Sequence, residues 1–370
     1  MVRRGALGKG LAHQGRRTAM TWTYLVGRED LGRTRLRAEP DPDPAALGAG
    51  EALFAIERFS LTANNITYGA FGDRMGYWRF FPSGEEGWGI IPVWGFATVT
   101  ASRAPGIEVG ARFYGYWPMA SHHVGRLEPR GRGAVDGSPH RADLAAAYNR
   151  YEPAEPRADD DLAALLRPLF LTSFLIDDLL ADAHPEATII VSSASSRTAL
   201  GLGWLVSRRG GRAIGLTSPR HLARVGSPGL FARAIAYESV DDLPTDGPAV
   251  FVDLAGDPRL RRRVHEKLGA NLQASIVVGT THLGADPGER APLPGPKPTF
   301  FFAPERFAKR LGDWGAAGVQ QKTGEALSHF IADSGWLRIV THRGPEGLAA
   351  AYARVLAGAG TPDEGDIVVP

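Results

Sequence analysis

Hydrophobic and polar residues alternate with two different rhythms along this chain. From Thr21 to about Val124, short apolar runs rich in aromatic and β-branched residues are separated by Gly and Pro, a pattern typical of β-strands. The runs with the clearest strand pattern are residues 52–57, 90–100 and 111–116. This part of the sequence therefore predicts a compact β-rich domain.

Beyond Val124 the chain enters a connection rich in Arg, Gly, Pro and Asp that continues to Pro156. We expect this connection to be exposed and to carry one short helix at residues 142–148. A helical stretch, interrupted by Pro168, then covers residues 162–180. Apolar runs and helical segments alternate after it, with the runs at residues 188–192, 213–217, 234–237, 249–253, 275–279 and 298–302. Strands that alternate with helices predict a parallel sheet.

The last part of the chain changes rhythm again, with a strand at 335–340, a helix at 346–357 and a strand at 367–369. We expect it to return to the first domain. The sequence thus predicts an α/β protein with a β-rich domain at residues 20–160, completed by residues 334–370, and a second domain at residues 161–333. Residues 1–19 are basic and contain no acid, which fits a targeting leader, a disordered arm or an extension upstream of a start at Met20. We expect the last of these, a disordered basic extension.

A turn of small residues in the second domain has the pattern of a phosphate-binding loop. Residues 187–204 predict a buried strand, a tight turn and a helix, and backbone N–H groups at a helix N-terminus bind a pyrophosphate. The candidate cofactor-binding residues here are Ser193, Ala194, Ser195, Ser196, Arg197 and Thr198. The regular glycine fingerprint is missing, so the alternative is an ordinary connection with Ser196 or Thr198 as helix cap. The position of the turn in the larger pattern favours the nucleotide interpretation.

The residues after the next strand predict which dinucleotide binds. An NAD-binding chain places an acid there to bind the ribose hydroxyls, whereas this chain has Thr217, Ser218 and Arg220. Because arginine grips a phosphate through two parallel hydrogen bonds, these residues predict NADP(H). A solvated loop with an incidental arginine is the alternative. Further candidates are Gly279, Thr280 and Thr281, which follow a later strand at the edge where ligands bind.

Composition narrows the classes of function. With 370 residues, 44% of them hydrophobic, the chain is long enough for two domains, and its net charge of +2 does not favour nucleic acid or a membrane as partner. The absence of cysteine excludes disulfides, thiolate metal ligands and cysteine nucleophiles, and we expect no metal site. No apolar run approaches the roughly 20 residues that cross a bilayer. Without a secretory leader, the expected location is the cytoplasm.

Several stretches, in their order along the chain, resemble the medium-chain dehydrogenase and reductase superfamily. The resemblance is carried by residues 91–100 (IPVWGFATVT), 107–116 (IEVGARFYGY) and 64–68 (NNITY). It implies a GroES-like β-rich domain joined to a Rossmann-like doubly wound parallel sheet. Because the superfamily's zinc enzymes use cysteine ligands, the resemblance points to the zinc-free reductases of quinones and enones. Other phrases, such as residues 301–304 (FFAP), resemble an uncharacterised branch.

Three residues of the first domain are candidates for catalysis. Tyr68 could donate a proton or hydrogen bond to a developing enolate or alkoxide, with Asn65 helping to orient it. His122, in a histidine pair with His123, could supply an acid that titrates near neutral pH. Ordinary packing for the tyrosine and a loop role for the histidine pair are the alternatives. The dense aromatic content around Tyr68 favours an apolar or aromatic carbonyl or enone substrate.

The leading hypothesis is therefore a zinc-independent, NADPH-dependent reductase acting on an apolar or aromatic enone, quinone or carbonyl compound. Two alternatives keep the fold: a lyase or isomerase without a redox step, and a non-catalytic nucleotide-binding protein. By analogy, a homodimer could form through the sheet edge near Phe301. A small-molecule substrate is the only other partner that we expect.

Overall fold

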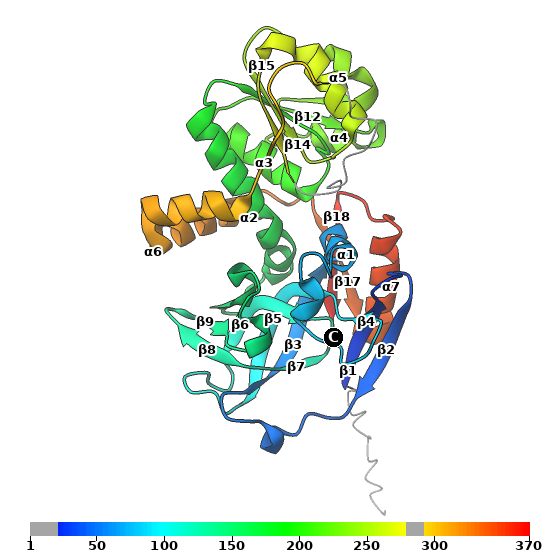
Figure 1. Ribbon diagram of the computed structural model, residues 1–370, viewed down its shortest axis with the longest axis vertical. Coiled ribbons are helices and arrows are strands. Elements are labelled where there is room, and N and C mark those ends of the chain that lie inside the picture. The colour runs from blue at the N-terminus through cyan, green and yellow to red at the C-terminus, as the bar shows by residue number, and fades with distance from the viewer. Residues whose placement is uncertain (1–20, 279–291) are drawn as a thin grey trace, which may run out of the picture.

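The computed structural model describes residues 21–278 and 292–370, and within these ranges the chain forms two units around separate sheets (Figure 1). The first unit is built on a nine-stranded sheet with the order β17-β18-β3-β5-β6-β10-β9-β8, and β7 pairs with β3. A three-stranded sheet, β2-β1-β4, lies beside it. Its elements are β1 Thr21–Gly27, β2 Thr34–Glu39, β3 Ala52–Leu61, α1 Ala63–Ala70, β4 Trp88–Gly89, β5 Pro92–Ser102, β6 Arg112–Pro118, β7 His122–Gly125, β8 Leu127–Arg130, β9 Gly133–Asp136, β10 Arg150–Pro153, β17 Arg338–Arg343, α7 Gly344–Leu356 and β18 Glu364–Val369.

The second unit is a six-stranded sheet with the order β13-β12-β11-β14-β15-β16, in which every pair is parallel. The order runs outward in both directions from β11, which is the doubly wound arrangement, and the switch point lies between β11 and β14. Its elements are α2 Asp160–Ala183, β11 Thr188–Val191, α3 Arg197–Arg208, β12 Ala213–Thr217, α4 Leu222–Val225, β13 Arg233–Ala236, β14 Ala249–Asp253, α5 Pro258–Leu268, β15 Leu272–Val277, β16 Thr299–Phe300 and α6 Ala303–Ala332. The predicted fold class is confirmed.

Two local expectations are wrong. The connection expected to be exposed at residues 125–156 contributes β8, β9 and β10 to the large sheet, and Arg141 and Tyr151 within it are buried. The short helix expected at residues 142–148 is replaced by two 3₁₀ turns, Pro139–Arg141 and Ala146–Asn149.

Helix α1 interrupts the strand-like part of the chain, and a reciprocal cap begins it: Thr62 Oγ1 accepts from the Asn64 N–H, and the Asn65 side chain accepts from the Thr62 N–H. Tyr68 therefore lies on a helix. No helix in the described ranges is long and apolar enough to cross a membrane.

Helix α2 joins the two units, because it packs against β3, β5 and β18 of the first and against α3 and α6 of the second. At its start, Asp160 accepts a hydrogen bond from the buried Arg112 of β6 at 2.7 Å. Near the middle of α2, Ser173 Oγ donates to the Thr198 carbonyl at 2.7 Å. Gly201 of α3 permits this approach, because a Cβ at this position would stand only 2.9 Å from Ser173 Oγ. This hydrogen bond from α2 thus fixes the position of the first turn of α3.

Helix α6 reverses direction at Gly315, whose φ of 69° and ψ of 170° break the helix (Figure 1). Ion pairs attach the part of α6 before Gly315 to α2. Arg306 and Arg310 are both nearly buried, both donate to Asp178, and both also reach Asp182. Because buried charges need partners, Asp178 is the centre of this attachment.

Asp178→Ala is expected to lower the free energy of unfolding by about 2–3 kcal/mol, because it removes the most buried carboxylate from two largely buried guanidinium groups, leaving the more exposed Asp182 to both and Asp313 to Arg310. The midpoint of urea unfolding measures the loss. The matched control is Asp313→Ala, which removes a more exposed carboxylate from the same Arg310 and should cost less than about 1 kcal/mol. Equal losses of stability in the two variants would show that Asp178 is not the centre of the attachment between α6 and α2.

Candidate functional site

The turn between β11 and α3 has the geometry of an anion-binding loop. Ser193 has a φ of 50°, the only positive value for a non-glycine residue in the described ranges. Ser196 caps α3 by accepting a hydrogen bond from the Ala199 N–H at 3.3 Å. The N–H groups of Arg197 and Thr198, in the first turn of the helix, have no acceptor among the described residues. Free amides at a helix N-terminus attract negative charge, so this turn can bind a phosphate.

Small residues let the turn lie tightly against the sheet. The Ala194 N–H donates to the Leu216 carbonyl of β12 at 3.0 Å, and the Ala194 side chain is fully buried. Gly215 makes this possible, because a Cβ there would stand 2.7 Å from the Ala194 Cβ and 2.5 Å from a Val225 methyl. Ala194 in the turn and Gly215 in β12 thus provide together the close approach that a glycine fingerprint provides within one loop.

A buried carboxylate braces the same edge of the sheet. Asp253, at the end of β14, accepts hydrogen bonds from Ser192 Oγ at 2.8 Å and from the Gly256 N–H at 2.9 Å. Arg261 Nε donates to its other oxygen at 2.9 Å. Asp253 is fully buried and turned into the loop, so its role is structural, as its position after a strand predicts.

The Arg197 side chain leaves the phosphate turn and crosses to the first unit. Its guanidinium donates to the Glu364 carbonyl of β18, and its Nε is buried without a partner. Burial lowers the pKa of Arg197, and Asp366 partly offsets this effect. The Arg197 side chain therefore links the two units, while its backbone N–H stays available for a ligand at the phosphate turn.

The residues predicted to recognise a 2′-phosphate gather beyond β12. Thr217 is buried at the strand end, Ser218 is half-buried, and Arg220 is exposed. Arg220 Nε donates to His221 Nε2 at 3.1 Å, and its terminal nitrogens have no partner among the described residues. The Arg220 guanidinium is thus available to a ligand phosphate. Gly279, Thr280 and Thr281 lie outside the described residues.

Tyr237 is a residue of this site that the sequence interpretation missed. Its hydroxyl accepts a hydrogen bond from the Ser193 N–H at 3.1 Å, so it borders the phosphate turn. The expected strand included Tyr237, whereas β13 ends one residue earlier, at Ala236. A boundary placed at Ala236 would have put Tyr237 at the carboxyl edge of the sheet, where ligands bind.

In the first unit, the Tyr68 hydroxyl is held by two donors. It accepts hydrogen bonds from Asn64 Nδ2 at 2.8 Å and from the Trp94 indole N–H at 3.3 Å. The orienting contact expected of Asn65 is thus made by Asn64. Asn65 is committed to the α1 cap, and its Nδ2 donates to the Pro92 carbonyl at 3.0 Å. Burial raises the pKa of Tyr68, so the phenol is protonated at neutral pH and acts as a donor.

Tyr68 belongs to a set of aromatic side chains that we call the tyrosine cluster: Tyr68, Tyr77, Trp94, Tyr114, Tyr116 and Tyr148. The Tyr68 ring lies 4.5 Å from the Tyr77 ring and 5.7 Å from the Tyr116 ring, and the Tyr77 and Tyr148 hydroxyls are 3.3 Å apart. Trp94 and Tyr114 also belong to the larger apolar cluster that includes α2 and the parallel strands, and Arg167 of α2 packs over the Tyr114 ring. The tyrosine cluster is therefore continuous, through α2, with the core of the second unit.

His122 lies outside the tyrosine cluster. It is on β7, opposite Ala55 of β3, and its Nδ1 is 3.1 Å from Ser121 Oγ in a groove of about 670 Å³. Phe81 packs between Tyr116 and His123, so it separates the groove from the tyrosines. Burial lowers the pKa of His122, and that of His123 to about 3, so both imidazoles are largely neutral at pH 7. The structure does not bring His122 together with Tyr68.

Metal ligands do not gather at either place. Within residues 21–278 and 292–370, no group of three or more His, Cys, Asp or Glu side chains could hold a metal ion. The polar groups of the tyrosine cluster are phenols, an indole and the Asn64 amide. Its chemistry is therefore hydrogen-bond donation in an apolar surrounding.

Solved structures with the same fold cover almost the whole chain. CurA from Vibrio vulnificus, in complex with NADPH, is 15% identical with a TM-score of 0.63, and the match covers 94% of this chain and 98% of CurA. The CurK enoyl reductase is 12% identical with a TM-score of 0.58, covering 95% and 98%. A mycobacterial protein complexed with NADPH is 17% identical with a TM-score of 0.54, covering 95% and 100%. These likenesses confirm the fold of the medium-chain dehydrogenases and reductases.

Sequence comparison gives the family. No curated protein matches the chain. One family model, described as "Protein of unknown function (DUF2855)", matches residues 59–361, a range that holds the phosphate turn, Tyr68 and β17. The chain therefore belongs to the DUF2855 family.

Proposed function

We propose that this protein is a zinc-independent, NADPH-dependent oxidoreductase that reduces an apolar or aromatic enone, quinone or carbonyl compound. The observation that carries the proposal is the phosphate turn, with a left-handed Ser193 and two free amides at the start of α3. Two solved structures with this fold are complexes with NADPH, which supports the choice of ligand.

The residues of the chain fit NADPH better than NADH. The Arg197 and Thr198 amides would hold the pyrophosphate, and Arg220, with Thr217 and Ser218 beside it, would hold the 2′-phosphate. No carboxylate follows β12 to bind a free 2′-hydroxyl. Tyr237 adds a hydroxyl at the same edge.

Tyr68 would serve the substrate. Bound NADPH supplies a hydride, and the substrate oxygen then gains negative charge. A donor that is already in place stabilises that charge without having to reorient. The Asn64 and Trp94 N–H groups occupy the acceptor positions of the Tyr68 oxygen, so its own proton is directed elsewhere, toward the substrate. The apolar rings around it exclude water and favour an apolar substrate.

The proposal is tested by titrating the purified protein with NADPH and with NADH, following tryptophan quenching and nicotinamide emission. We expect NADPH to bind at least about tenfold more tightly, because an arginine–phosphate pair contributes charge-assisted hydrogen bonds. Consumption of NADPH with added enones or quinones then separates a reductase from a lyase or isomerase on this fold. Binding of neither nucleotide would reject the proposal.

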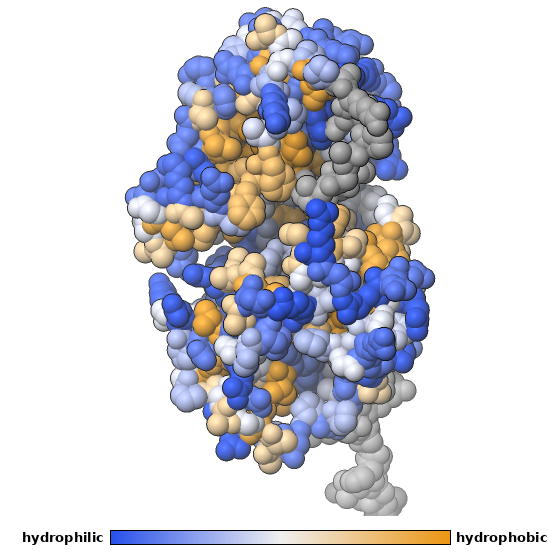
Figure 2. Space-filling model, viewed as in Figure 1, coloured by the Kyte–Doolittle hydropathy of each residue, from blue (hydrophilic) through white to orange (hydrophobic). Residues whose placement is uncertain are grey.

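The exposed edge of the parallel sheet also suggests a homodimer. Phe301 is buried, but Phe300 and Phe302 are each more than half exposed at β16 and the start of α6. Figure 2 shows apolar side chains gathered where the chain passes from this sheet to α6. An unpaired edge strand flanked by exposed aromatics is a site where a second copy can pair.

Phe300→Asp is expected to shift the protein from dimer to monomer, because a charge on the edge strand opposes pairing. Analytical ultracentrifugation measures the change. Val109→Asp, which replaces an exposed apolar residue of the first unit, is the control and should leave the mass unchanged. A monomeric parent protein would contradict the expected dimer.

A further inference from the structure

Two hydroxyl groups in the tyrosine cluster are buried without a hydrogen-bond partner. The Tyr114 hydroxyl and the Tyr116 hydroxyl make no hydrogen bond with a described residue, although that of Tyr116 lies beside the Tyr68 side chain. Tyr114 is 3% exposed and Tyr116 is fully buried. Buried polar groups are almost always paired in folded proteins, so two orphans in one cluster call for a physical reason.

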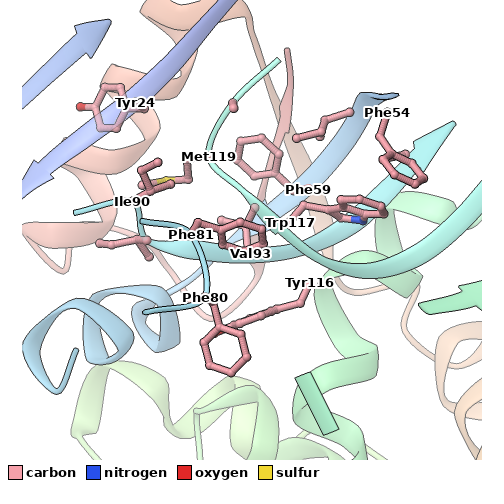
Figure 3. Close-up of a cluster of buried hydrophobic side chains, with 14 of the residues drawn as sticks. Tyr24, Phe54, Phe59, Phe80, Phe81, Ile90, Val93, Tyr116, Trp117 and Met119 are labelled. Carbon is pink, nitrogen blue, oxygen red and sulfur yellow. The ribbon is translucent and has the colours of Figure 1, made fainter. Parts of the chain in front are cut away.

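The sheet register brings both hydroxyls to the side of Tyr68. Tyr116 lies opposite Trp94, and Tyr114 lies opposite Phe96, so these side chains share one face of β5 and β6. Tyr116 and Trp117 leave β6 on opposite sides, with the Tyr116 ring against Phe80 (Figure 3). Burial raises the pKa of both phenols, and the nearby Tyr68 raises it further. The orphan hydroxyls therefore lie close to the Tyr68 hydroxyl, as protonated donors.

Every polar group of the cluster carries a donor proton. Asn64 and Trp94 donate to Tyr68, one of Tyr77 and Tyr148 donates to the other, and the Tyr114 and Tyr116 protons have no acceptor. The nearest charges to Tyr114 are Arg167, which packs over its ring at 4.4 Å, and Glu152, which is paired with Arg167. A phenol oxygen can accept as well as donate, yet no acceptor among the described residues receives the Tyr114 and Tyr116 protons, so the cluster holds more O–H protons than it binds internally.

We infer that Tyr114 and Tyr116 are ligand-binding residues, and that the ligand is a planar apolar molecule with at least two acceptor oxygens. One oxygen accepts from Tyr68, and the other accepts from Tyr114 and Tyr116. This inference rests on the proposed function for the role of Tyr68. It adds that quinones and dicarbonyl compounds are preferred over simple enones, which carry one acceptor oxygen.

Tyr148 is the side of the cluster that can open. It is half-buried, it belongs to the short turn Ala146–Asn149, and the three alanines before it are exposed. Its hydroxyl lies 3.3 Å from the Tyr77 hydroxyl. A planar ligand that displaces the Tyr148 ring would reach all three phenols.

The first test measures stability. Keeping an unpaired hydroxyl in the interior is destabilising, so Tyr116→Phe and Tyr114→Phe should each raise the melting temperature, by about 2 °C. The matched control is Tyr151→Phe, because the buried Tyr151 hydroxyl donates to the Tyr116 carbonyl at 2.8 Å and accepts from Arg141. That variant should melt at a lower temperature. A lower melting temperature for Tyr116→Phe would overturn the inference, because it would mean that the hydroxyl is already satisfied in the free protein.

The second test measures ligand binding by equilibrium dialysis, without nucleotide. The probes are 1,4-naphthoquinone, which has two acceptor oxygens, and 1,4-dimethylnaphthalene, which has a similar shape and none. The chain has no cysteine for the quinone to alkylate. We expect the quinone to bind at least about tenfold more tightly, and Tyr116→Phe to weaken it about fivefold to thirtyfold while leaving dimethylnaphthalene unchanged. Equal binding of the two probes would overturn the inference.

The two proposals fail in different ways. If neither NADPH nor NADH binds but the quinone is still selected and depends on Tyr116, the reductase is rejected and the acceptor-oxygen site stands. If NADPH binds and is consumed with an enone but the probes bind equally, the reductase stands and Tyr114 and Tyr116 are packing residues.

Discussion

Tyr68→Phe is expected to lower kcat by about 10²–10³-fold, because it removes one donor to the oxygen that becomes negative in the transition state. The change deletes a single oxygen and keeps the ring contacts with Tyr77 and Tyr116. NADPH affinity should stay within a factor of about two, since the phenol contacts no part of the phosphate turn. Steady-state kinetics with a quinone, together with nucleotide titration, measure both quantities.

The control for Tyr68 is Tyr24→Phe, a buried tyrosine of β1 that packs on Tyr352 outside the tyrosine cluster. It should leave kcat unchanged. The dependence of kcat on pH gives a second check. Because burial raises the pKa of Tyr68 above its usual value of 10.0, the phenol keeps its proton at pH 10 and should still act as a donor there. Unaltered turnover in Tyr68→Phe would remove this residue from the mechanism.

Arg220→Asp is expected to weaken NADPH binding by about 100-fold and to leave NADH binding nearly unchanged. The substitution removes a free guanidinium and places a negative charge where the 2′-phosphate would lie, so an attraction is replaced by a repulsion. The same fluorescence titration measures both nucleotides in parent and variant.

The matched control is Arg212→Asp, the same change at an exposed arginine near the amino end of β12, opposite to the end that Arg220 follows. It should not alter either affinity, which separates a local phosphate contact from a general effect of net charge. Equal losses for NADPH and NADH in Arg220→Asp would show that Arg220 does not recognise the 2′-phosphate.

Much of the fold can be predicted from the sequence because its signals are periodic. Alternating apolar runs and helical segments announce the parallel sheet, and β11, β12 and β14 begin or end within one residue of the expected positions. Helix α1 could not be found in this way, since it has only eight residues between long strands. Its signal is the cap, Thr62 followed by Asn65, which is local and is easily hidden by the strand pattern around it.

The site is harder to predict than the fold, because neighbouring residues have different directions. Asn64 and Asn65 are adjacent, yet one contacts Tyr68 and the other closes the helix cap. Successive side chains on a helix point about 100° apart, so two adjacent asparagines face different neighbours. The residue type alone cannot tell which asparagine contacts Tyr68. The distance between His122 and the tyrosines depends on strand pairing and on the Phe81 ring, which are tertiary features.

The place of β18 has a consequence for the order of folding. This strand, residues 364–369, lies between β17 and β3, so the antiparallel sheet cannot close until the ribosome has released residue 369. The last strand of the parallel sheet ends at residue 300, and α6, which adds Phe330 and Ile331 to the core of that unit, ends at residue 332. During synthesis the first strands therefore lack their neighbour β18 at a time when the later unit already has its strands and most of its core. A holdase chaperone that binds exposed β-strands should be found on nascent chains that stop before β18 and not on finished ones.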